Sequence, residues 1–246
     1  MFSLQERDRA RDHVLEMAAS DPRVVAGAVV GSLAHGAGDR WSDLDLTFGV
    51  ADDVPVADVL TDWTGRVVAD LDAVVLFDLP SGPTIYRVFL LPGCLQIDVS
   101  FTPAARFGAG GPRFRLLFGE THPRQSPEPP PARELFGWAV AYAREARACI
   151  ERGRPWQAAH SIDEIRQRAL TLACLRRGLP TSFGRGYDDL PPDVLHAFHG
   201  SLVSSLGRRE LLGALASSVG GLLRESAEVD VAAKVAPSLH ELLSAD

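Results

Sequence analysis

Two aspartates, Asp43 and Asp45, are separated by a single residue in the segment WSDLDL. Alternate residues of a β-strand point to the same face, so the two carboxylates are predicted to lie side by side while Leu44 and Leu46 face the core. Adjacent carboxylates repel each other unless a divalent cation lies between them. Ligation by oxygen alone suits Mg²⁺, which takes its remaining ligands from water and phosphate groups.

A third carboxylate, Asp98, interrupts the segment LQIDVSF. The alternation predicts that Gln96, Asp98 and Ser100 share one face of a strand, while the apolar residues between them occupy the other. An aspartate within so apolar a strand is costly to bury, which favours a role for Asp98 in metal binding or proton transfer.

The third feature is Gly31-Ser32, which ends the β-branched run Val24–Val30. Glycine permits a turn whose amide hydrogens face a phosphate, and the serine hydroxyl can donate to the same group. Each of the three features is common by itself, as a plain turn or a solvated strand end. Their occurrence together, in this order and each on or beside a strand, predicts a functional site.

The elements that must position these residues follow from the apolar patterns. Helices are predicted at 3–19 and 55–69, and a hairpin is predicted around Pro92-Gly93. About five strands are predicted in this half: 24–30, 44–50, 73–77, 84–91 and 94–101.

The second half is predicted to be an all-α bundle. Five prolines in residues 123–131 exclude a helix or a central strand there and indicate a semi-rigid linker. Apolar residues then recur at helical spacing. Helices are predicted at 133–152, 156–177, 192–205, 208–225 and 234–244. The predicted organisation is a catalytic domain at 1–122, a linker at 123–132 and a helical domain at 133–246, which we expect to bind the acceptor.

The motif GSLAHGAGDRWSDLDL, with a later strand aspartate, resembles the DNA polymerase β-like nucleotidyltransferase superfamily. Within it, the match looks most like the antibiotic nucleotidyltransferases that adenylylate aminoglycosides or lincosamides. The resemblance covers roughly residues 24–101. It implies an α+β protein, in which an α/β domain with a mixed sheet precedes a helical bundle. Many relatives carry Arg after the Gly-Ser turn where this chain has His35, a change that concerns phosphate contacts and no metal ligand.

The resemblance also implies roles for individual residues. Gly31 and Ser32 would hold the triphosphate, together with the metal that Asp43 and Asp45 bind. Asp98 would complete a second metal site or act as the base that deprotonates the acceptor hydroxyl. Two Mg²⁺ ions and ATP, or another nucleoside triphosphate, are therefore the expected cofactor and co-substrate. Arg40, Arg113 and Arg115 could steady the triphosphate, and the sequence does not select among them.

The second half contains one further candidate, Glu164. His160, Glu164, Gln167 and Thr171 recur at helical spacing opposite the apolar stripe, and from there Glu164 could serve the acceptor as a base. The same residue also fits a solvated helix face on which it pairs with Arg168 four residues later, and we favour that interpretation.

Charge and composition limit the classes of binding partner that we expect. Residues 1–122 contain 17 Asp or Glu against 10 Arg, while residues 123–246 contain 15 of each sign. A grip on long nucleic acid needs a surplus of cations, so no nucleic-acid partner is expected. No apolar run approaches the roughly 20 residues that cross a bilayer, so no membrane partner is expected. The alternating charges of the amino terminus do not fit a secretory signal, and we expect a cytoplasmic protein.

The sequence thus predicts a Mg²⁺-dependent enzyme that moves a nucleoside monophosphate, AMP from ATP, onto a hydroxyl of a small molecule such as an antibiotic. Two alternatives stay open. One is an AMP-transferase that modifies a protein, of antitoxin-like or regulatory type. The other is a non-catalytic module that binds a nucleotide, although a mere binder could dispense with one of the three carboxylates.

Overall fold

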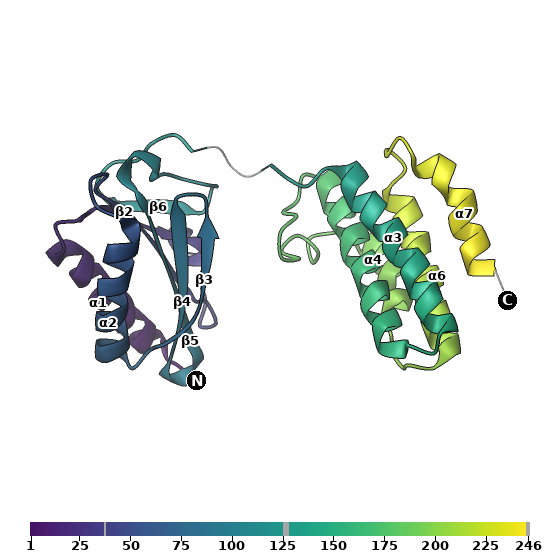
Figure 1. Ribbon diagram of the computed structural model, residues 1–246, viewed down its shortest axis with the longest axis horizontal. Coiled ribbons are helices and arrows are strands. Elements are labelled where there is room, and N and C mark those ends of the chain that lie inside the picture. Colours follow the sequence, from purple (N-terminus) through teal and green to yellow (C-terminus); the bar gives the residue numbers. More distant parts are fainter. Residues whose placement is uncertain (37, 125–127, 245–246) are drawn as a thin grey trace. The chain divides into compact units, whose positions relative to one another are not determined.

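The computed structural model describes residues 1–36, 38–124 and 128–244. Contacts between Cα atoms divide the chain into two compact units, Met1–Pro127 and Glu128–Asp246 (Figure 1). Part of the linker expected at 123–132, namely residues 125–127, lies outside the described residues. Among the helices that are described, none is long and apolar enough to cross a membrane.

The first unit consists of one six-stranded sheet and two long helices. The elements are α1 (Leu4–Ser20), β1 (Val24–Val30), the 3-10 helix η1 (Gly31–His35), β2 (Leu44–Val50), α2 (Val56–Leu71), β3 (Val74–Ser81), β4 (Thr84–Leu91), η2 (Pro92–Cys94), β5 (Leu95–Pro103), η3 (Ala104–Arg106) and β6 (Phe114–Phe118). The strand order is β3-β4-β5-β2-β1-β6. Among the strands of the described residues, β2 and β5 pair in parallel and the other pairs are antiparallel, so the sheet is mixed.

The core of this unit lies between the sheet and the two helices, which occupy the same side of it (Figure 1). Strand alternation sends Leu44 and Ile97 to that side, where both are fully buried. The ring of Trp63 on α2 packs 5.1 Å from Phe48 and 5.0 Å from Phe101. These aromatic contacts hold α2 on the central strands, while the opposite face carries the smaller apolar cluster of Ala26, Ala28 and Phe107 and the polar side chains of β2 and β5.

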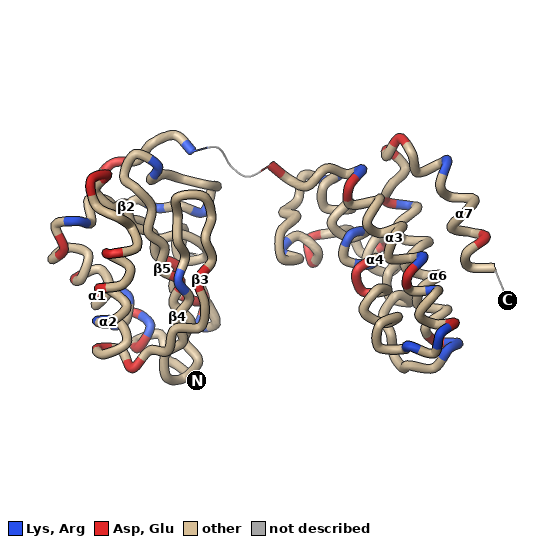
Figure 2. Tube along the Cα trace, in the orientation of Figure 1, with Lys and Arg blue, Asp and Glu red and all other residues tan. Residues whose placement is uncertain are grey.

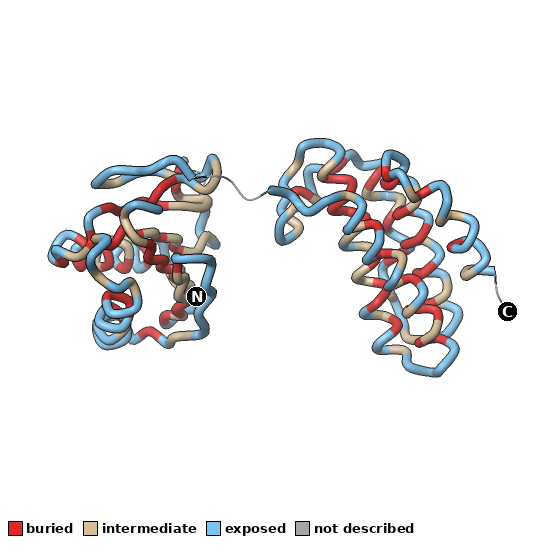
Figure 3. The backbone as a smooth tube through the Cα atoms, turned by 45° about the horizontal axis from the view of Figure 1, so that its top comes forward, coloured by how far each residue is buried: buried red, intermediate tan, exposed pale blue. Residues whose placement is uncertain are grey.

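The second unit is all helical. Its elements are α3 (Ala132–Glu151), α4 (Pro155–Arg176), α5 (Pro192–Phe198), η4 (His199–Ser201), α6 (Arg208–Glu225) and α7 (Ala232–Ser244). Ala139, Ala143 and Ala146 are fully buried along one face of α3, where their small side chains let neighbouring helices approach closely. Buried residues accordingly line the inner faces of the bundle in Figure 3, and positions of both charge signs are interspersed along its helices in Figure 2.

The fold class is confirmed, since a mixed-sheet unit precedes a helical bundle, and three details of the prediction are wrong. The sheet has a sixth strand, β6, because FRLLF, which lies between the turn residues GAGGP and Gly119, pairs along β1. The helix expected at 192–205 ends at Phe198 and continues only as η4. Asp43 lies just before β2 rather than within it, since the strand begins at Leu44.

Candidate active site

The turn after β1 brings the backbone close to a carboxylate. Gly31 has φ +71°, a conformation that suits glycine, and its amide donates to the carbonyl oxygen of Arg113 at 3.1 Å. A Cβ atom at this position would stand 2.2 Å from Oδ2 of Asp45. Glycine is therefore required twice here, by the backbone conformation and by the approach of Asp45.

Residues 39–42, which precede Asp43 and β2, are fixed by their own side chains. Oδ1 of Asp39 accepts hydrogen bonds from the amide of Trp41 at 2.8 Å and from the hydroxyl of Ser42 at 3.1 Å. The amide of Trp41 is the main cause that lowers the pKa of Asp39. Arg7, buried on α1, donates to the carbonyl oxygen of Asp39 at 2.5 Å. Asp43, just before β2, therefore follows a fixed segment of backbone.

Parallel pairing places the three aspartates together. Asp45 of β2 and Asp98 of β5 are direct partners in the register, and one carboxylate oxygen from each of Asp43, Asp45 and Asp98 lies within 4.8 Å of the other two. All three side chains are half-buried. Their neighbours Leu44 and Ile97 are buried toward α1 and α2, so the carboxylates of the two strands lie on the opposite face of the sheet.

The electrostatics of this cluster favour a bound cation. Burial raises the pKa of Asp98, the negative charge of Asp43 raises it further, and a hydrogen bond from Nε2 of Gln96 at 2.9 Å opposes both. Among the described residues, no Lys, Arg or His forms an ion pair with Asp43 or Asp98. Three carboxylates this close repel one another, and a hard divalent cation with oxygen ligands relieves that repulsion. The donor set fits Mg²⁺.

A cavity of ≈ 180 Å³ opens beside the turn, lined by Gly31, Ser32, His35 and Arg113. Nε2 of His35 donates to the carbonyl oxygen of Pro112 at 2.6 Å, and this hydrogen bond orients the imidazole. The wall thus combines a glycine turn, a hydroxyl, an imidazole and a guanidinium. This set of groups recognises an anion such as a phosphate.

Of the three arginines near the motif, the structure brings Arg113 to this cavity. Nε of Arg115 donates to the carbonyl oxygen of Ala34 at 3.1 Å, and Arg40 lies 4.4 Å from the ring centroid of Trp41. The sequence could not select Arg113 because its position depends on the pairing of β6 with β1, which carries it back to the turn. The sequence signal that could have placed Arg113 there is the run RFRLLF, had it been identified as a strand.

Glu164 lies on α4 in the second unit. Its carboxylate accepts from Nη1 of Arg168, the partner expected four residues later, and the guanidinium of Arg168 lies 4.7 Å from the ring centroid of Tyr142. Glu164 is thus engaged within its own helix, and the geometry of the aspartate cluster involves residues of the first unit alone.

No family model and no curated protein matches the sequence. Among solved structures, the chain is similar to an aminoglycoside 6-adenyltransferase from Bacillus subtilis, with 12% identity and a TM-score of 0.40 over 98% of this chain and 99% of that one. A nucleotidyltransferase-like protein from Exiguobacterium sibiricum shows 15% identity and a TM-score of 0.40, with 90% and 77% covered. An E. coli CdnC:HORMA-deltaN complex shows 13% identity and a TM-score of 0.28, with 97% and 89% covered. At these TM-scores, the geometry of the site itself carries the functional argument.

Proposed function

We propose that this protein is a Mg²⁺-dependent nucleotidyltransferase that moves AMP from ATP onto a hydroxyl of a small molecule such as an antibiotic. The observation that carries the proposal is the meeting of three half-buried carboxylates within 4.8 Å, beside a glycine turn and a small cavity with an arginine on its wall. Carboxylates for a metal next to groups for a phosphate are what transfer from a nucleoside triphosphate requires.

The turn and its cavity would bind the triphosphate. The amide of Ser32, its hydroxyl and the guanidinium of Arg113 can all donate to phosphate oxygens, and Gly31 lets the chain come close to them. His35 is held at the same wall by its hydrogen bond to the carbonyl oxygen of Pro112, at the position where many members of the family that the motif resembles carry Arg. The phosphates would thus lie beside the aspartates, as the reaction requires.

Asp43, Asp45 and Asp98 would hold the metal, in one or two sites. When bound, Mg²⁺ supplies positive charge that offsets the negative charge on the phosphates and on the attacking and leaving oxygens. Asp45 is positioned by its contact with the Gly31 turn, and Asp98 by the hydrogen bond from Gln96. The loop that Asp39 closes positions Asp43.

Asp98 is our choice for the base. The oxygen of the acceptor hydroxyl would attack the α-phosphorus of ATP in line, and its proton would pass to Asp98. A bond would form between that oxygen and phosphorus, while the bond from the α-phosphorus to the bridging oxygen breaks and pyrophosphate leaves with the electron pair. Asp98 is the register partner of Asp45, so its carboxylate lies beside the metal-binding aspartates, within reach of an acceptor bound there. Glu164 is the weaker candidate because Arg168 already engages it.

A small-molecule acceptor is preferred over a polynucleotide because acidic residues exceed basic ones in the first unit and balance them in the second. Two alternatives use the same site: transfer of AMP to a protein hydroxyl, and nucleotide binding without transfer. The cytoplasm is the expected place of the reaction. The retention of all three carboxylates argues against a mere binder.

The test is transfer of label from each α-labelled nucleoside triphosphate to pooled small-molecule acceptors, with the product identified by mass. Asp43→Asn or Asp45→Asn should lower transfer by about 100-fold or more, since a metal contributes several kcal/mol to the transition state. Asp53→Asn, at an exposed carboxylate of the same unit, is the matched control and should leave transfer unchanged. Unchanged turnover in both site variants would refute the assignment. Label on protein alone would favour the first alternative, and binding without pyrophosphate release the second.

A further inference from the structure

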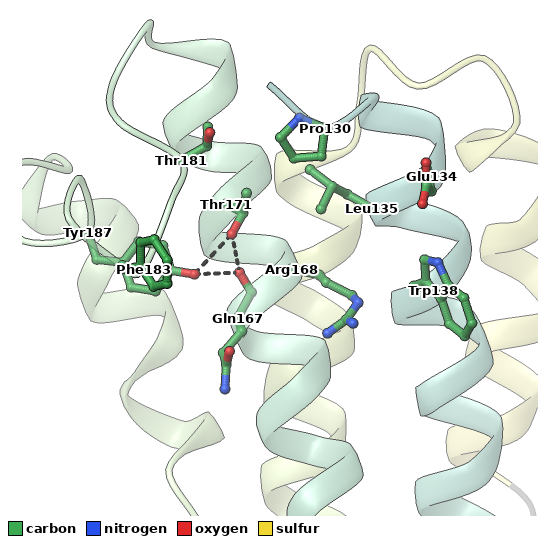
Figure 4. Close-up of a pocket in the computed structure, with 11 residues that line it drawn as sticks. Pro130, Glu134, Leu135, Trp138, Gln167, Arg168, Thr171, Thr181, Phe183 and Tyr187 are labelled. Carbon is green, nitrogen blue, oxygen red and sulfur yellow. Dashed lines mark hydrogen bonds between the residues drawn. The ribbon is translucent and has the colours of Figure 1, made fainter. Parts of the chain in front are cut away.

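The helical unit contains a cavity of its own, of ≈ 680 Å³, which we call the α3–α4 cavity (Figure 4). It lies between α3, α4 and the loop that follows α4, and every residue of its wall belongs to the second unit. Its volume falls within the range of small-molecule sites, roughly 300–1,000 Å³. No group of the proposed transfer site takes part in it.

Aromatic rings form opposite sides of this cavity. Figure 4 shows Phe183 and Tyr187 on one side and Trp138 on the other, with Gln167 and Arg168 of α4 between them. Phe183 is 92% exposed and Trp138 is 53% exposed, although large apolar side chains are more often covered. The two rings therefore present apolar surface to a ligand-sized space, and a ligand placed there would cover them.

The loop holds Phe183 in an unusual conformation. Its φ is +57°, a left-handed conformation that is strained for a bulky residue, and Gly184 follows at φ +70°. The turn is closed by hydrogen bonds from the amide of Arg185 to Ser182 at 3.2 Å and from the amide of Tyr187 to Gly184 at 3.0 Å. Strain that a folded loop maintains in order to expose a ring is typical of a ligand clamp.

Most polar groups of the wall are already engaged. The hydroxyls of Thr171 and Tyr187 both lie 2.8 Å from the carbonyl oxygen of Gln167 and 2.9 Å from each other. The guanidinium of Arg168 is neutralised by Glu164 and stacks on Tyr142 outside the wall. These groups shape the cavity, and they add no net charge to it.

One charged group of the wall remains, the carboxylate of Glu134. It stands on α3 one turn before Trp138, so both side chains face the same way. Among the described residues it forms no ion pair, whereas the neighbouring Arg133 pairs with Asp230. The cavity thus combines an uncompensated negative charge with exposed aromatic rings.

We propose that the α3–α4 cavity binds a small organic monocation, an ammonium group carried on an apolar ring or chain. The faces of Trp and Phe rings attract cations, and the carboxylate of Glu134 adds direct charge complementarity. The guanidinium of Arg185 lies 5.2 Å from the ring centroid of Phe183 and covers one face of that ring, so Trp138 and Glu134 of α3 would supply the main contacts to the cation. The carboxylate of Glu134 would repel a ligand that carries a phosphate, and Arg168 would not offset this repulsion because it is paired with Glu164.

The experiment is calorimetric titration of the full-length protein, without nucleotide or metal, with benzyltrimethylammonium, benzyl alcohol and benzoate. These probes share one ring and differ in charge. The cation should bind at least about fivefold more tightly than benzyl alcohol, and benzoate should bind least. Because no transfer is measured, the result is independent of the proposed reaction. Absence of cation binding, or equal binding of all three probes, would overturn the proposal.

Variants locate the binding site. Glu134→Gln and Trp138→Ala should each weaken binding of benzyltrimethylammonium by about fivefold. Their matched controls are Glu241→Gln, an exposed carboxylate of the same unit, and Trp156→Ala, an indole that is 78% exposed on α4 and outside the cavity wall. Both controls should bind as the unmodified protein does. Glu134→Gln changes only a surface carboxylate and keeps the test valid if Trp138→Ala fails to fold. Equal weakening by a variant and its control would place the cation elsewhere.

Discussion

The close approach of Gly31 to Asp45 makes Gly31→Ala the sharpest probe of the transfer site. Two effects are expected. Alanine in a left-handed conformation destabilises the fold by about 1–2 kcal/mol. In addition, the new Cβ would stand 2.2 Å from Oδ2 of Asp45, where ordinary contact begins at 3.4 Å, so the carboxylate must move by about 1 Å. A displacement of about 1 Å in a catalytic group can cost about 100-fold in rate.

Gly36→Ala separates these two effects. Gly36 has the same φ, +71°, and a Cβ placed there would meet nothing within 4 Å. It should therefore carry the backbone penalty of about 1–2 kcal/mol without displacing Asp45. Transfer by Gly36→Ala should stay within about threefold of the unmodified protein, while Gly31→Ala should lose about 100-fold.

The assay needs no knowledge of the acceptor. Unfolding in urea is measured with and without Mg²⁺ and ATP, since a ligand that binds only the folded state stabilises it by about 2.7 kcal/mol at 100 times its Kd. Gly36→Ala should keep this gain and Gly31→Ala should lose most of it. Equal stabilisation of both variants by Mg²⁺ and ATP would refute the view that Gly31 positions a metal-binding carboxylate.

Three further predictions follow from single contacts. Arg113→Ala should weaken ATP binding by about tenfold in calorimetry, because a charged hydrogen bond to phosphate is lost, and unchanged affinity would remove Arg113 from the site. Glu164→Gln should leave transfer within about twofold and destabilise the fold by no more than about 1 kcal/mol, since it loses only the pair with Arg168; a loss of about 100-fold would instead make Glu164 the base. Arg23 holds the pKa of Asp21 well below its usual range, so this carboxylate stabilises the fold above a pH of about 4, and its contribution is lost as the pH falls further. The free energy of unfolding in urea should therefore depend less on pH between about pH 4 and pH 2 in Asp21→Asn than in the unmodified protein. An identical pH dependence in the two proteins would contradict this.

Local patterns were enough to predict much of the first unit. β1 and β2 begin and end where the apolar runs predicted, and the strand around Asp98 was identified from its alternation. These predictions succeed because strand alternation is a local property, set by the two-residue period of the pleat. The same property indicated that Asp98 faces away from the core.

Local patterns failed where long-range pairing decides. Arg113 lies far from Gly31 in the sequence, and its place beside the turn follows from the pairing of β6 with β1. Likewise, nothing in a sequence of helical period shows that the loop carrying Phe183 stands opposite Trp138. Tertiary packing decides which distant segments lie side by side, and the periodicity of a sequence does not show this.

The amino-acid sequence alone determined the α+β class, the chemical identity of the three aspartates and the face on which the strands present Asp45 and Asp98, because residue type and backbone period are local. Tertiary structure alone decided that β2 and β5 are parallel neighbours in a register that pairs Asp45 with Asp98. It also decided that residue 31 must be glycine, because a Cβ atom there would stand 2.2 Å from Oδ2 of Asp45 on another strand. A metal site depends on distances between side chains that are remote in the chain, and only the folded sheet sets those distances.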